Sequence, residues 1–120
     1  MNREEFVMRM FEKAVISSVA ACVKTLRQPA GRKPQASLVE ASQWFNELAD
    51  SDRAFVERCV KRGAEMALFS VFTVLDGVSF IEDAGSKGDF ELYFRKDGER
   101  VLLNPQDGEL LHEMMPSDPM

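Results

Sequence analysis

The sequence has 120 residues and a formal net charge of −5, a size that suits one hydrophobic core, and we expect a single domain over residues 1–120. Apolar residues make up 45% of the chain, which is typical of a globular protein and excludes a disordered one. The acidic balance argues against nucleic-acid binding, because phosphate contacts need clustered lysine and arginine side chains.

Two helices are predicted before residue 50. Asn2 caps the first, whose apolar residues recur at steps of three and four until Pro29 stops it. A basic, Pro- and Gly-containing loop follows. Ser37 and Glu40 then form a Ser-x-x-Glu capping box, which predicts that a second helix opens at Ser37 and ends near Ala49.

A third helix is predicted to begin at a cap provided by Ser51 or Asp52. Its second half, residues 66–75, is apolar nearly all round, and a helix that is apolar on every side is buried on every side. We therefore expect this half to be the central element of the fold. Gly63, in mid-helix, marks a close helix crossing, and Gly77 ends the helix in the left-handed conformation.

Beyond Gly77 the apolar period changes from that of a helix to that of a strand. Alternating apolar and polar residues predict a hairpin over residues 89–103, turned at Asp97-Gly98 in a type I′ turn. Residues 78–81 are the candidate for a third strand, and residues 109–115 read as a short closing helix. The fold class expected is thus α+β, with three main helices, a small antiparallel sheet and a short C-terminal helix.

Targeting signals, disulfides and metal sites are not indicated. No apolar run reaches the roughly 18 residues that span a bilayer, and an acidic start with Glu4 and Glu5 does not fit a signal peptide. We expect a cytoplasmic protein without membrane contact. Cys22 and Cys59 lie in helical patterns, so we expect them to be buried and reduced. No cofactor motif is present, and no metal or cofactor is expected.

The negative charge is concentrated in the C-terminal part of the chain. Residues 1–75 hold 11 basic and 9 acidic side chains, whereas residues 76–120 hold 4 basic and 11 acidic ones, a net of −7. Two interpretations stay open, a solvated surface that aids solubility and an acidic face for a basic partner. The residues that we expect on such a face are Asp76, Glu82, Asp83, Asp89 and Glu91.

Three residues have a structural and a functional reading. Asp76 stands at a helix C-terminus, where the helix dipole disfavours an acid, and either stabilises the turn or binds a partner. Trp44 lies beside an apolar stripe and is either a core residue or an anchor for a partner. His112 is the sole histidine and either caps or packs the last helix or belongs to a nucleophilic site, which would lack a cysteine or serine in a catalytic motif.

Three segments resemble a group of small bacterial proteins of uncharacterised activity. The segments are residues 67–78, which contain Leu-Asp-Gly-Val, residues 90–94, and Val101-Leu-Leu-Asn104 followed by an ending in Leu-His112. The resemblance implies a bacterial cytoplasmic protein and carries no activity over to this chain. In size and acidity the chain is also similar to immunity proteins that neutralise bacterial toxins, a likeness of general character without a matching motif.

These observations favour a non-enzymatic protein that binds another protein, of the immunity type, which would occlude a toxin by charge-complementary contact with a basic surface. The alternative is a small acidic secretion chaperone or adaptor that holds an effector segment, and such a protein is expected to form a homodimer. An enzyme that works through the clustered carboxylates ranks third, because nothing in the sequence shows a cleft for a substrate.

Overall fold

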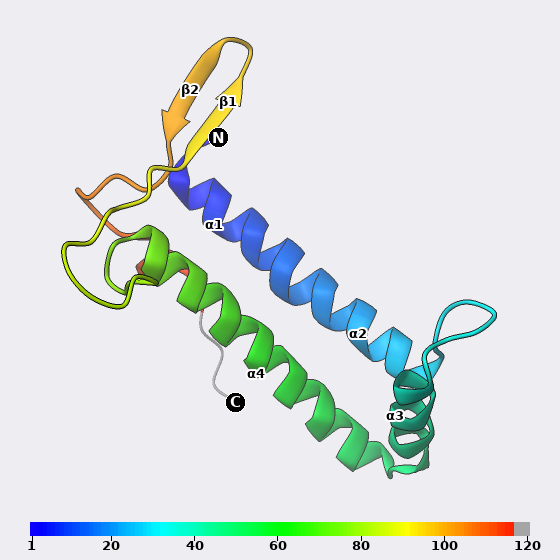
Figure 1. Cartoon of the computed structure of the whole chain (residues 1–120). Coiled ribbons are helices and arrows are strands. Elements are labelled where there is room, and N and C mark those ends of the chain that lie inside the picture. The colour runs from blue at the N-terminus through cyan, green and yellow to red at the C-terminus, as the bar shows by residue number, and fades with distance from the viewer. Residues whose placement is uncertain (117–120) are drawn as a thin grey trace.

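The computed structural model describes residues 1–116, and its fold is α+β, as the sequence predicts. Two long antiparallel rods lie side by side, with one short helix across one end and a hairpin and an irregular loop at the other (Figure 1). The first rod is a continuous helix in three parts, and the second rod is α4. The elements are α1 (Arg3–Phe11), η1 (Glu12–Ser17), α2 (Ser18–Arg27), α3 (Ala36–Glu47), α4 (Asp50–Leu75), β1 (Tyr93–Lys96), β2 (Glu99–Leu102) and α5 (Leu111–Met114).

The first rod begins where the sequence predicts, because the Asn2 side-chain oxygen accepts a hydrogen bond from the Glu5 backbone N–H at 2.8 Å. Its middle part, η1, is a π-helix. The wider turn of a π-helix rotates everything that follows it relative to an α-helical pattern. As a result Val23 is buried, whereas Cys22, which the regular 3.6-residue period places in the core, is exposed. The prediction that Cys22 is buried is therefore wrong.

The core lies between the two rods at the end that carries α5. Its buried side chains come from α1 and η1 on one side and from α4 and α5 on the other, and they are Val7, Phe11, Val15, Leu68, Phe72 and Leu111. The rings of Phe6 and Phe72 pack against each other at 6.1 Å between centroids. This core rests on one side of α4 only.

The other side of α4 is uncovered, and this corrects two predictions. Residues 66–75 are not buried on every side, since Met66, Phe69 and Val71 are 57%, 45% and 53% exposed. Cys59, predicted to be buried, is also exposed. The physical reason is that the fold packs its other helices against one side of α4 only. Met66 and Val71 are therefore exposed on two different flanks, and the half-exposed Phe69 has an edge-on contact with the His112 ring at 5.5 Å between centroids.

The starts of α3 and α4 both fall earlier in the sequence than the predicted caps. The cap position of α3 is Gln35 rather than Ser37, and that of α4 is Ala49 rather than Ser51 or Asp52, with no side-chain capping bond at either start. Arg53 holds the corner between them instead, since its guanidinium donates to the backbone oxygens of Asn46 at 3.2 Å and Leu48 at 2.6 Å and pairs with Asp50. Contacts of the Arg53 side chain with the corner itself therefore take the place of the predicted caps.

The hairpin forms within the predicted range, with Tyr93 opposite Leu102 and Lys96 opposite Glu99. Asp97 and Gly98 have φ values of 51° and 78°, as a type I′ turn requires. No strand forms at residues 78–81, contrary to the sequence-based expectation. The backbone N–H groups of Val78 and Ser79 donate back to the Thr73 oxygen instead, at 2.9 and 3.2 Å, which turns this segment away from a ladder.

The chain is far more open than a compact monomer of its size. Its accessible surface is 8684 Å², against about 6,600 Å² expected for a compact monomer of this mass. The radius of gyration is 18.3 Å, against about 14 Å expected for 120 residues. Within the described residues no helix is long and apolar enough to cross a membrane, α4 included.

Candidate functional site

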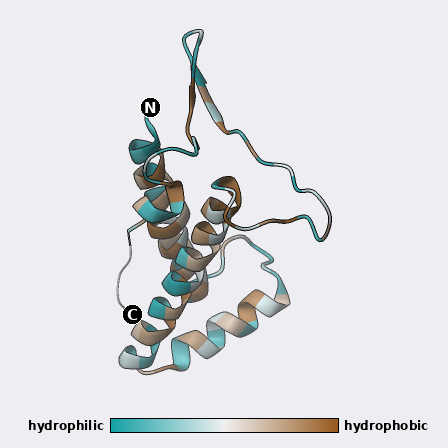
Figure 2. Cartoon of the chain, turned by 90° about the vertical axis from the view of Figure 1, so that its left-hand side faces the viewer, coloured by the Kyte–Doolittle hydropathy of each residue, from teal (hydrophilic) through white to brown (hydrophobic). Residues whose placement is uncertain are grey.

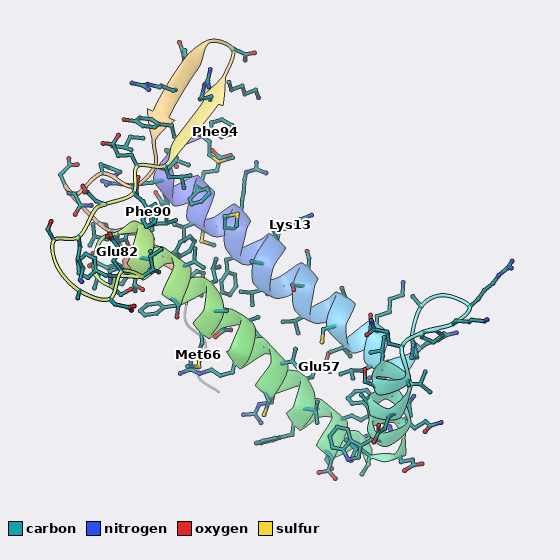
Figure 3. The ribbon with its side chains drawn as sticks, viewed as in Figure 1. Lys13, Glu57, Met66, Glu82, Phe90 and Phe94 are labelled. Atoms are coloured by element: carbon teal, nitrogen blue, oxygen red, sulfur yellow. The ribbon has the colours of Figure 1, made fainter. Side chains whose placement is uncertain are left out.

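The most distinctive feature at the hairpin end is a 15-residue irregular segment, residues 77–91, which we call the acidic loop. Figure 3 labels Glu82 and Phe90 in it, and Figure 2 shows that apolar residues continue from the end of α4 into its first part. A loop of this length whose ends are held together is an Ω-loop, a class that is frequently functional. The groups that hold its two ends define the site.

The first end of the loop is fixed by the way α4 stops. Gly77 has a φ of +75°, in the left-handed region that glycine adopts without strain. The N–H of Gly77 donates to the Val74 oxygen at 3.1 Å, and the N–H of Val78 donates to the Thr73 oxygen at 2.9 Å. This pair of bonds is a Schellman motif, so the predicted role of Gly77 is confirmed.

Asn104 then clamps the two ends of the loop together. Its Nδ2 donates to the backbone oxygens of Leu75, at 2.7 Å, and Phe90, at 2.8 Å, while its Oδ1 accepts from the Leu92 N–H at 2.8 Å. The residue is 4% exposed. One buried amide therefore joins the end of α4, which precedes the loop, to the segment that follows it.

Asp76, one of the predicted binding residues, is a structural group. Its side chain is fully buried, and its carboxylate accepts hydrogen bonds from the backbone N–H groups of Leu111, at 3.0 Å, and His112, at 2.8 Å. It thereby caps the first turn of α5. His112 Nδ1 lies 2.7 Å from Asp76 Oδ2. An acid that is unfavourable at the end of α4 is thus placed where the dipole of a different helix favours it.

The loop itself exposes both large apolar and acidic side chains. Val78, Phe80, Ile81 and Phe90 are 56%, 52%, 68% and 47% exposed. The predicted residues Glu82, Asp83, Asp89 and Glu91 all lie in this loop and are exposed, as the sequence-based face requires. Glu82 closes the loop tip, because its Oε1 accepts from the Gly88 N–H at 2.9 Å.

Glu91 marks the point where the loop enters the hairpin. Its Oε2 accepts a hydrogen bond from the Tyr93 hydroxyl at 2.7 Å. This bond, followed by partial desolvation and the negative charge of Glu91, raises the pKa of Tyr93 above 10.0, while the nearby Arg100 acts in the opposite direction. The hairpin is otherwise the basic part of the C-terminal region, since Arg95, Lys96 and Arg100 lie on it. With four acids and one lysine the loop has a net charge of −3, and the remaining −4 of residues 76–120 lies outside it.

Trp44 is not part of this surface. It is 54% exposed on α3, and α3 and the acidic loop lie at opposite ends of a molecule that is 50 Å long (Figure 1). The structure brings the four loop acids together and separates Trp44 from them. Sequence reasoning missed Asn104 as the clamp of the site, although the Leu-Leu-Asn segment was singled out by resemblance, because a hydrogen bond across 29 residues leaves no local pattern.

A pocket of about 530 Å³ lies beside α4. The residues that line it include Met66, Phe69, Ser70 and His112. Of the Asp76–His112 pair only His112 lines it, with the buried Asp76 behind the imidazole, an arrangement that orients a general base in hydrolases. The Ser70 hydroxyl, however, donates to the Met66 backbone oxygen at 2.9 Å. Among the described residues no group of three or more His, Cys, Asp or Glu side chains is placed to hold a metal ion.

Comparison with protein-family models, curated proteins and solved structures gave no match for this chain. The resemblance to small bacterial proteins and the general likeness to immunity proteins therefore stay predictions from sequence. Residues from two of the three segments that carry the resemblance nevertheless lie together in the structure. Asp76, Asn104 and His112 all belong to the framework that anchors the acidic loop.

Proposed function

We propose that this chain is a non-enzymatic protein-binding protein whose binding surface is the acidic loop. The observation that supports this is the exposure of four large apolar side chains on one anchored loop, among four acids. Exposed apolar clusters bounded by polar residues are typical of protein-interaction sites. The anchoring by Asn104 and by the Gly77 turn limits the conformational entropy lost on binding.

Apolar and acidic residues have separate roles in this proposal. The apolar side chains, Phe80 and Ile81 foremost, supply affinity through burial, about 1.5–3 kcal/mol for each side chain that is fully covered. The acids, Asp83 and Asp89 foremost, accelerate association with a basic surface and discriminate against acidic ones. A basic active site, such as that of a nuclease toxin, fits both requirements, so we propose an inhibitor of the immunity type in a bacterial cytoplasm.

A secretion chaperone or adaptor is the second candidate, and the hairpin is the observation that favours it. Within residues 1–116 the sheet has two strands, so β1 and β2 each present an edge that no described strand pairs with. An extended effector segment can add to such an edge as a further strand. In this case the hairpin edge, rather than the acidic loop, is the binding surface.

The test uses the partner captured from the source cell by the immobilised wild-type chain, with association and dissociation rates measured on the purified pair. The loop variant carries Asp83→Lys and Asp89→Lys, two exposed acids that leave the Glu82 and Glu91 hydrogen bonds intact. We expect association to slow at least about tenfold at low salt, with less effect at 1 M salt, where the Debye length is about 3 Å.

Glu12→Lys with Glu40→Lys is the matched control, because it makes the same charge change at exposed positions on the helices. The double variant Phe80→Ser and Ile81→Ser should mainly speed dissociation. The expected increase is about tenfold or more, because each of the two side chains loses a burial energy of the size given above. If the loop variant and the control variant slow association equally, the loop acids act only through the net charge of the chain. Arg100→Pro in β2 removes an N–H that faces the free edge, because Arg100 and Arg95 form a pair without ladder hydrogen bonds. Unchanged rates in both loop variants, with loss of binding on this change, would favour the chaperone hypothesis.

A further inference from the structure

A second surface lies along α4. It begins near α3 and reaches the first residues of the acidic loop, where Thr73 Oγ1 and Ser79 Oγ lie 2.8 Å apart. Six residues recur on it at alternating steps of four and three, the spacing of a coiled-coil seam: Phe55, Cys59, Arg62, Met66, Phe69 and Thr73. We call them the α4 seam. Five of the six are exposed, and Met66 points away from the first rod in Figure 3.

We propose that the α4 seam binds a second copy of this chain, as an antiparallel helix pair related by a two-fold axis near Ala64. The seam spans 18 residue steps, about 27 Å of helix. The accessible surface of 8684 Å² exceeds that of a compact monomer by about 2,000 Å². A stable interface buries about 800 Å² per partner. The whole chain therefore exposes more surface than one such interface needs, and the exposed side chains of Phe55, Met66 and Phe69 place part of that excess on α4.

The seam is complementary to itself in size when it pairs antiparallel about Ala64. Phe55 of one copy then lies opposite Thr73 of the other, and Cys59 lies opposite Phe69. Each of these layers joins an aromatic side chain to a small one, which is the pairing that fills a helix–helix seam without voids. A two-fold axis repeats each layer on the other side, as a closed homodimer requires.

Charge also selects the antiparallel arrangement. Arg62 then lies opposite the uncharged Met66 of the other copy, whereas parallel pairing in register sets Arg62 against Arg62. Arg62 also enters the region beside Met66 that Glu65 and Glu113 line, so it meets acids there. Like charges at close range disfavour the parallel pair.

Gly63 has a role in this arrangement that it lacks within one chain. A Cβ at Gly63 would meet no atom of the described part of the chain within 4 Å, so no contact seen there explains the glycine. It flanks the seam one residue from the two-fold axis, where the helices approach most closely. The absence of a side chain there lets the two α4 backbones come close together. The helix crossing that the sequence predicts at Gly63 then lies between two copies of the chain.

The first experiment measures mass by light scattering across a dilution series. We expect the wild type to show twice the 13.6 kDa chain mass at high concentration. Met66→Lys sets two lysines opposite arginines and should raise the dimer dissociation constant at least about tenfold relative to Met66→Glu, which sets opposite charges together. Val71→Lys is the control, because Val71 is similarly exposed at 53% but lies about 140° around the helix from Met66.

The second experiment tests the register by oxidation. In a Cys22→Ser background, Phe69→Cys should give a disulfide-linked dimer through Cys59 of the other copy, and Cys59 alone should not. Cross-linking through Cys59 alone would overturn the antiparallel register, as would equal dissociation by Met66→Lys and Met66→Glu. A wild type that stays monomeric at every concentration, or dissociation by Val71→Lys, would overturn the proposal itself. The acidic-loop variants should leave the mass unchanged, so the two surfaces are tested separately.

Discussion

Replacing Asn104 by alanine should release the acidic loop and destabilise the whole fold. The side chain makes three hydrogen bonds of 2.7–2.8 Å at a position that is 4% exposed. Each buried hydrogen bond contributes about 1 kcal/mol, so we expect the free energy of unfolding to fall by about 3 kcal/mol. That is a large share of the 5–15 kcal/mol that is typical of a domain.

Urea unfolding followed by the fluorescence of Trp44 is the direct assay. With a slope of about 1–3 kcal/mol per molar urea, the midpoint should drop by about 1–3 M. Trypsin cleavage after Lys87, the single basic residue of the loop, should accelerate in parallel. Asn104→Asp keeps the acceptor for Leu92 but sets an oxygen against two carbonyl oxygens, so it should be no more stable than the alanine variant.

Asn46→Ala is the matched control. The Asn46 amide also donates two hydrogen bonds, to the Arg27 oxygen at 2.9 Å and the Ser42 hydroxyl at 3.3 Å, but the residue is exposed and water can replace them. We expect a loss below about 1 kcal/mol there. If Asn104→Ala leaves both the unfolding free energy and the cleavage rate at Lys87 unchanged, the clamp does not hold the loop and the reasoning fails.

Two further predictions concern the ends of the loop. Gly77→Val should lower the unfolding free energy by about 1–2 kcal/mol, because a β-branched residue fits the left-handed region poorly. The control is Gly88→Val, at a position without positive φ, which should change the unfolding free energy by less than about 0.5 kcal/mol. Equal unfolding midpoints for the two variants would contradict the strain argument. Glu91→Ala should lower the pKa of Tyr93 toward 10, because it removes the hydrogen-bond acceptor and the negative charge that raise this pKa. Absorbance titration reports this directly, since Tyr93 is the only tyrosine, and an unmoved midpoint would show that the hydrogen bond does not act on the hydroxyl.

Sequence patterns predicted the elements of this fold better than their environments. The Asn2 cap, the Gly77 stop and the Asp97-Gly98 turn are local devices, each decided by a few neighbouring residues, and all three are confirmed. Burial is a property of the whole assembly. The one-residue shift at Cys22 follows from a π-helix that no periodicity count anticipates, and the uncovered flank of α4 follows from how few elements surround it.

The acids of the site could be predicted because they are close in sequence, and the framework could not. Glu82, Asp83, Asp89 and Glu91 lie within ten positions, so a charge count finds them. Asn104 and the Asp76–His112 pair act across 29 and 36 residues. Nothing local distinguishes an asparagine that will clamp a loop from one at the end of a strand, and the same holds for an acid that will cap a helix 35 residues away.

The two proposed surfaces together constrain what the protein can bind. α4 runs from the α3 end of the molecule to the acidic loop (Figure 1), so an antiparallel pair about Ala64 places the two acidic loops at opposite ends of the dimer. Loops so far apart cannot grip one small partner jointly, and an inhibitor of the immunity type must then bind one partner per chain. A chaperone that threads one effector segment along both copies would bind one per dimer. The stoichiometry of the complex with the captured partner therefore separates the two functions without any substitution in the chain.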